Sequence, residues 1–116
     1  MAGDAVTDAP VNSPFGQADV DRMVQALGDV TIERYRQQAK WGEQNLDPFA
    51  YGAVLTEEVG EAMKAALHAR FGGPESGNLR AELVQVAAVA VAMIECLDRD
   101  TWHWGNHATL GPGGKA

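Results

Sequence analysis

Two groups of carboxylates occupy positions where helical segments are expected to be buried. The first group is Glu57, Glu58 and Glu61, and the second is Glu82, which directly precedes the apolar run of residues 83–97. Burying an isolated carboxylate costs several kcal/mol unless a cation or hydrogen bonds compensate it. A bound divalent metal ion would supply that compensation. Oxygen-only ligands of this kind suit Mg²⁺ or Mn²⁺, so these residues suggest metal-assisted phosphate chemistry.

The spacing of these carboxylates is compatible with one shared ion. Glu58 and Glu61 are separated by about 60° around a helix, so both side chains can reach the same point. If their helix packs antiparallel against the next one, residues 58–61 come opposite residues 82–89. A simpler interpretation also fits: Glu57 and Glu61 are then solvated, and Glu82 is stabilised by the dipole of a helix N-terminus.

Three helical segments are expected to carry these residues, and no segment shows strand alternation. Residues 19–41 repeat apolar side chains at helical spacing and form either one long helix or two short ones divided at Gly28 and Asp29. Asp47 and Pro48 then form a helix start, an N-cap acceptor followed by proline at the first position. This second helix runs to about residue 70. The glycines and proline at 72–74 end it.

The third helix, expected at about residues 79–98 with Ser76 or Asn78 as its cap, determines the architecture. Among residues 83–97, only Gln85 and Glu95 are polar. Such a helix must be covered on all sides, which two other helices of one chain cannot easily do. We therefore expect an all-α helical bundle completed by homo-oligomerisation, as a dimer or a dimer of dimers. Residues 1–17 form a flexible arm, 18–100 the helical domain and 101–116 a flexible tail.

Composition excludes several functional classes. The 116 residues fit one domain, and a formal charge of −7 argues against nucleic-acid binding. The single cysteine, Cys96, lies in the apolar third segment and is expected to be a buried, inert thiol. Neither a signal peptide nor a membrane span is recognisable. We expect a cytoplasmic protein with no membrane partner.

The order of three motifs carries a resemblance to a known family. Lys-Trp-Gly-Glu-Gln at 40–44 precedes Glu-x-x-Glu at 58–61, and after a gap of 20 residues Glu-x-x-Gln follows at 82–85, leading into the apolar run 86–91. In this arrangement residues 34–98 resemble the MazG-like, all-α nucleotide pyrophosphohydrolases, related to dimeric dUTPases and phosphoribosyl-ATP pyrophosphatases. The family pattern is Glu-x-x-Glu on one helix and Glu-x-x-Asp on the next. Gln85 therefore stands where the family has aspartate.

The resemblance implies an activity and a set of metal ligands. The reaction would be Mg²⁺-dependent hydrolysis of a nucleoside triphosphate between its α and β phosphates, giving a monophosphate and pyrophosphate, as part of nucleotide-pool housekeeping. Glu58, Glu61 and Glu82 would ligate the metal with Gln85 as a fourth ligand, and Glu57 and Glu58 are the candidate catalytic carboxylates. Because glutamine removes one negative charge, metal affinity is expected to fall.

Substrate contacts are expected from nearby cations and one aromatic ring. Lys40, Lys64 and Arg80 are candidates for binding phosphates, and Trp41 for stacking on a base. Each has an ordinary alternative: an i,i+3 ion pair for Lys64, a surface position for Lys40 and Arg80, and a packing anchor for Trp41. The alternative function is a non-catalytic helical oligomer, or a nucleotide-binding module whose metal site has decayed through Gln85.

Overall fold

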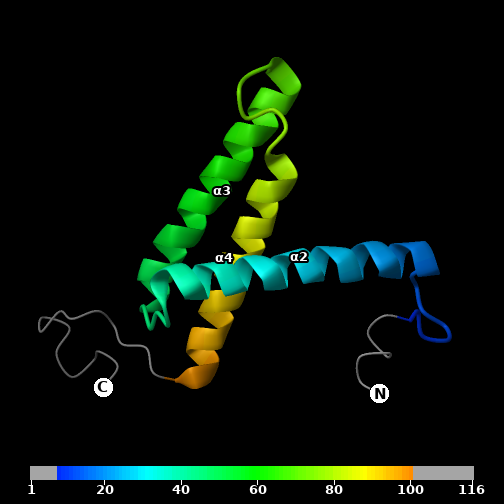
Figure 1. The fold of residues 1–116 in the computed structure, drawn as a ribbon, viewed down its shortest axis with the longest axis horizontal. Coiled ribbons are helices and arrows are strands. Elements are labelled where there is room, and N and C mark those ends of the chain that lie inside the picture. Colours follow the sequence, from blue (N-terminus) through cyan, green and yellow to red (C-terminus); the bar gives the residue numbers. More distant parts are fainter. Residues whose placement is uncertain (1–7, 101–116) are drawn as a thin grey trace, which may run out of the picture.

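The computed structural model describes residues 8–100, and the part it describes is entirely helical, without strands (Figure 1). Helix α2 spans Gln17–Trp41, α3 spans Pro48–Phe71 and α4 spans Leu79–Arg99. The all-α prediction is confirmed. Residues 1–7 of the predicted arm and all of the predicted tail, residues 101–116, lie outside the described residues. Residues 8–16 contain a turn in which the Ser13 N–H donates to the Pro10 carbonyl at 3.0 Å.

Helix α2 is one continuous helix rather than two. It passes through Gly28 without a break, and Gln25 supports it there by donating to Asp29 one turn later at 3.1 Å. Helix α3 begins where the sequence predicts, because the Asp47 carboxylate accepts a hydrogen bond from the Ala50 N–H at 2.9 Å. Helix α4 has Asn78 as its N-cap residue, but the Asn78 side chain makes no capping bond.

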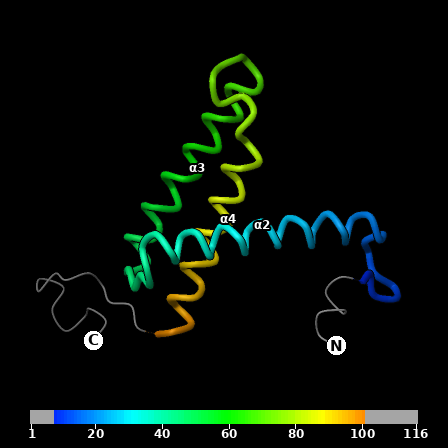
Figure 2. Tube along the Cα trace, viewed as in Figure 1, coloured from blue at the N-terminus to red at the C-terminus, as the bar shows by residue number. Residues whose placement is uncertain are grey.

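A short connection, residues 72–78, joins α3 to α4, and the two helices form an antiparallel hairpin (Figure 2). Gly72 and Gly73 both have positive φ, 95° and 151°, and the Gly72 N–H donates to the His68 carbonyl at 2.7 Å. The His68 ring then accepts a hydrogen bond at Nδ1 from the Glu75 N–H at 3.1 Å. The imidazole of His68 thus fastens the end of α3 to the turn that follows it.

Helix α4 is the centre of the fold, because α3 packs along it and α2 crosses it (Figure 1). The buried residues between α3 and α4 are mostly small, which lets the two helices approach closely; they include Ala62, Ala65, Ala88 and Val89. Cys96 is buried, as predicted, and burial raises the pKa of its thiol. No helix in the described part of the chain is long and apolar enough to cross a membrane.

Many large apolar side chains stay exposed in the single chain. Tyr35 is 75% exposed, Phe71 73% and Leu67 58%. Helix α4 is not covered on all sides as the sequence requires, since Ile94 is 56% exposed and Leu83 48%. Large exposed apolar side chains that gather into a patch commonly mark an interaction site in soluble proteins. The packing of α2 and α3 therefore leaves part of the apolar surface of α4 uncovered.

Candidate functional site

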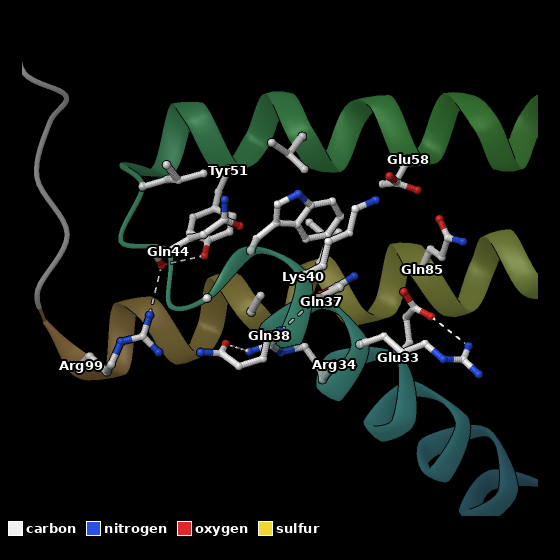
Figure 3. A pocket seen from close by; sticks show the side chains of 17 residues that line it. Glu33, Arg34, Gln37, Gln38, Lys40, Gln44, Tyr51, Glu58, Gln85 and Arg99 are labelled. Atoms are coloured by element: carbon white, nitrogen blue, oxygen red, sulfur yellow. Dashed lines mark hydrogen bonds and ion pairs between the residues drawn. The ribbon is translucent and has the colours of Figure 1, made fainter.

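A groove of about 330 Å³ lies where the C-terminal half of α2, the α2–α3 connection and the facing sides of α3 and α4 meet. Figure 3 shows its layout. Glu58 and Gln85 lie at one end, with Glu33 nearby, and Tyr51 and Arg99 lie at the other. All three helices therefore contribute side chains to a single hollow, and its volume is within the range of small-molecule sites.

The acidic end joins three helices. Glu58 comes from α3, Gln85 from α4 and Glu33 from α2, and all three line the groove. The Glu33 side chain is only 17% exposed, and Arg36 approaches its carboxylate at 3.4 Å. Sequence reasoning did not identify Glu33, because its position beside Glu58 depends on how α2 crosses the α3–α4 hairpin.

Repulsion between carboxylates distinguishes this end of the groove. The pKa of Glu58 is raised, first by desolvation and then by the negative charges of Glu82 and Glu61, with further contributions from Glu57 and Glu33. The effect of Glu82 on Glu58 fits the antiparallel register that the sequence suggested, with residues 58–61 opposite the start of α4. A cation bound among these groups would relieve the repulsion that now favours protonation of Glu58.

The donor chemistry fits a hard divalent ion, because Glu58, Glu61 and Glu82 offer carboxylate oxygens and Gln85 an amide oxygen. Among residues 8–100, however, no three His, Cys, Asp or Glu side chains are already gathered as a metal-binding group. Glu61 and Glu82 act on Glu58 through their charge and do not line the groove. The four-residue ligand set therefore stays a prediction.

Of the predicted substrate contacts, Lys40 and Trp41 line the groove. The Lys40 ammonium lies 4.7 Å from the centre of the Trp41 ring, a cation–π contact, and Trp41 remains 55% exposed. A ring this open is not a buried packing anchor. Its exposed surface is available for a stacking partner.

The other predicted residues lie outside the groove. Glu57 and Lys64 are exposed on α3. Arg80 forms an ion pair with Asp29 at 2.8 Å and so links the start of α4 to α2. That pairing matches the ordinary alternative for Arg80, a surface residue, and the substrate roles of Arg80 and Lys64 stay predictions without a supporting contact.

Several groove residues were missed by sequence reasoning. Arg99 donates to the Gln44 carbonyl at 3.1 Å and to Asn45 Oδ1 at 3.0 Å, and the Tyr51 hydroxyl donates to the same Gln44 carbonyl at 2.9 Å. These bonds hold the α2–α3 connection against the end of the hairpin. These hydrogen bonds join residues up to 55 positions apart, so a local sequence pattern cannot predict them.

Comparison of the chain with models of protein families, with curated proteins and with solved structures found no match.

Proposed function

We propose that this protein is a MazG-like, Mg²⁺-dependent nucleoside triphosphate pyrophosphohydrolase that cleaves a (deoxy)nucleoside triphosphate to the monophosphate and pyrophosphate. One observation carries the proposal. A single groove joins Glu58 and Gln85, which belong to the two acidic motifs, to Lys40 and Trp41 of the motif that precedes them. Three segments of the chain that resemble one family thus meet at one hollow, with oxygen ligands at one end and cationic and aromatic groups beside them.

In this proposal the carboxylates would hold the metal, and one of them would accept a proton from water. Glu58, Glu61, Glu82 and Gln85 would hold Mg²⁺, or Mn²⁺, which when bound neutralises the polyphosphate and lowers the pKa of an attacking water. Because α3 and α4 pack against each other, rotation of the flexible glutamate side chains would let them converge on one ion. Of the two candidate bases, Glu58 is better placed than Glu57, because Glu58 lines the groove and Glu57 does not.

Cations of α2 are placed to contact the phosphates. Lys40 and Arg36 both line the groove, and the Arg36 side chain is 74% exposed, so its guanidinium can turn toward a ligand. The charges of these groups offset the acidic end and attract the triphosphate. Lys64 and Arg80 are further phosphate contacts in this proposal only if the bound state brings them closer.

The proposed assembly is a homo-oligomer of two or four chains. Ile94 and Leu83 on α4 and Tyr35 on α2 form large exposed apolar positions that a second copy would cover. Burial of each such side chain stabilises the assembly by roughly 1.5–3 kcal/mol before ordering costs. We propose a cytoplasmic location, which suits a housekeeping hydrolase of free nucleotides.

The experiment that tests the function is pyrophosphate release from a panel of ordinary and modified nucleoside triphosphates, with Mg²⁺, with Mn²⁺ and with chelator. Turnover is expected with metal and is expected to disappear with chelator. Glu61→Gln should abolish it while circular dichroism remains helical, whereas Asp98→Asn, an exposed change on α4, should not. Turnover of Glu61→Gln at the parental rate would overturn the ligand assignment. No turnover of any nucleotide would favour the alternative, a non-catalytic oligomer or a nucleotide-binding module.

A further inference from the structure

Gln37 is the one buried polar side chain in the described part of the chain. It lies on α2, is only 8% exposed and lines the groove. Figure 3 places it with Lys40 between the Glu58 and Gln85 end and the Tyr51 end. A primary amide so deeply buried needs a partner for both its oxygen and its nitrogen.

The oxygen of this amide has its partner. Arg34 Nη1 donates to Gln37 Oε1 at 3.4 Å, and a guanidinium has donors only, so the oxygen must face it. Arg34 is itself held by two hydrogen bonds to the Glu95 carboxylate, at 2.7 and 2.8 Å. The sequence of contacts from Glu95 through Arg34 to Gln37 fixes which way the amide points.

The amide nitrogen of Gln37 has no partner within the described residues. Within residues 8–100 the Gln37 Nε2 makes no hydrogen bond, although every fully inaccessible side-chain nitrogen or oxygen there has a partner. Nε2 therefore reaches solvent, and the side chain borders the groove. The result is a pre-oriented N–H donor on a wall that offers a ligand a place for an acceptor atom.

We propose that Gln37 Nε2 selects the nucleobase by donating to a carbonyl oxygen, O4 of uracil or thymine or O6 of guanine. This inference rests on the proposed function, in which the groove binds a nucleotide. With the triphosphate at the Glu58 and Gln85 end, the base lies toward Tyr51, beside Gln37 and the open ring of Trp41. Cytosine and adenine present an amino group at the corresponding position, so two donors would face each other and the pairing is lost.

The test uses two ligands that differ at the position in question. The α,β-imido analogues of dUTP and dCTP resist cleavage and carry a carbonyl and an amino group, respectively, at position 4. Binding to the full chain is measured by calorimetry with Mg²⁺ present. The wild-type protein is expected to bind the dUTP analogue about 10-fold more tightly, the ratio that one hydrogen bond typically gives.

Two variants distinguish the effect of the Gln37 N–H donor from the effect of the length of the side chain. Gln37→Glu keeps an oxygen for Arg34 but replaces the N–H donor with an acceptor, so the preference should vanish or reverse. Gln37→Met keeps the length and removes both polar atoms, so the preference should vanish. Gln25→Glu, an exposed change on the same helix outside the groove, should leave the ratio unchanged.

The outcomes separate this inference from the proposed function. Equal binding of the two analogues by the wild type, or a preference that survives both Gln37 variants, overturns the role of Gln37 while pyrophosphate release can still stand. A dUTP preference lost in both variants, in a chain that releases no pyrophosphate, supports the role of Gln37 and overturns the enzymatic function. Failure to bind either analogue overturns the role of Gln37, and it overturns the enzymatic function as well when no nucleotide of the panel releases pyrophosphate.

Discussion

Arg34 of α2 and Glu95 of α4 are joined by two parallel hydrogen bonds, from Nε to Oε2 at 2.7 Å and from Nη2 to Oε1 at 2.8 Å. The two residues are 61 positions apart in the sequence and meet where α2 crosses α4. Paired bonds of this kind define an angle as well as a distance. This ion pair therefore helps to fix how α2 lies on the hairpin, and with it the shape of the groove.

Glu95→Gln should weaken the packing of α2 on α4. The Arg34 side chain is 15% exposed and that of Glu95 41%, so solvent screening limits the expected loss of unfolding free energy to about 1 kcal/mol. Urea denaturation measures it, with Asp98→Asn as a control that removes an exposed charge from the same helix. An equal loss in both variants would contradict a specific role for the ion pair.

The same ion pair should make stability depend on pH. The Arg34 hydrogen bond lowers the pKa of Glu95 below its ordinary value of 4.5, so the unfolded chain binds this proton more readily than the folded one. The contribution of the pair is therefore complete above pH 4.5 and lost as the pH falls through the lowered pKa. The difference in unfolding free energy between wild type and Glu95→Gln should be constant near neutral pH and shrink in acid. A difference that grows in acid would contradict this assignment.

Gly73→Ala should destabilise the turn between α3 and α4. Gly73 has φ of 151°, and an added Cβ would overlap the His68 ring, with Cδ2 and Nδ1 both at 2.7 Å. Strain of this kind costs of order 1–3 kcal/mol. Thermal unfolding measures the loss, and Gly77→Ala is a matched control because a Cβ there meets nothing within 4 Å. Similar melting temperatures for the two variants would show that the His68 contact does not constrain the turn.

Helix ends were predictable because short-range chemistry sets them. Asp47 and Pro48 begin α3, and the glycines that follow Phe71 end it, as local capping rules require. The continuity of α2 was not predictable, since one glycine costs a helix only about 1 kcal/mol and surrounding contacts decide whether it breaks.

The candidate site was predictable only in part, for a similar reason. Glu58 and Gln85 follow from motifs that each lie within one helix. The role of Gln37 depends on Arg34 and, through it, on Glu95 far along the chain. A signal for it existed: Arg34, Gln37 and Trp41 are spaced by three and four residues and share one face of α2. The sequence could not say that this face closes a groove.

Ile94→Glu should prevent the proposed self-association. Ile94 is 56% exposed on α4, where a second copy would bury it, and a charge placed in such an interface is strongly disfavoured. Sedimentation velocity is expected to show an oligomer for the wild type and a monomer for the variant. Val11→Glu is the control, because Val11 is 91% exposed before α2 begins. A wild type that stays monomeric at all concentrations tested would contradict the oligomer itself.

Gln85→Asp should strengthen divalent metal binding. Gln85 faces Glu58 across the acidic end of the groove, and a carboxylate in its place adds one negative charge to the ligand set (Figure 3). Without metal, that charge adds to the repulsion that already raises the pKa of Glu58, so the variant should melt at a lower temperature than the wild type. With Mg²⁺ the variant should melt at a higher temperature than the wild type. An ion that binds only the folded state stabilises that state more as its concentration rises above its dissociation constant.

Thermal unfolding over a Mg²⁺ titration measures both effects without relying on turnover. Gln38→Asp provides the control, since Gln38 lines the groove but Figure 3 places it away from Glu58. The expected result is a steeper Mg²⁺-dependent rise in melting temperature for Gln85→Asp than for either the wild type or the control. If Gln85→Asp lowers the melting temperature equally with and without Mg²⁺, no ion binds between Glu58 and position 85. The proposed set of metal ligands would then be wrong.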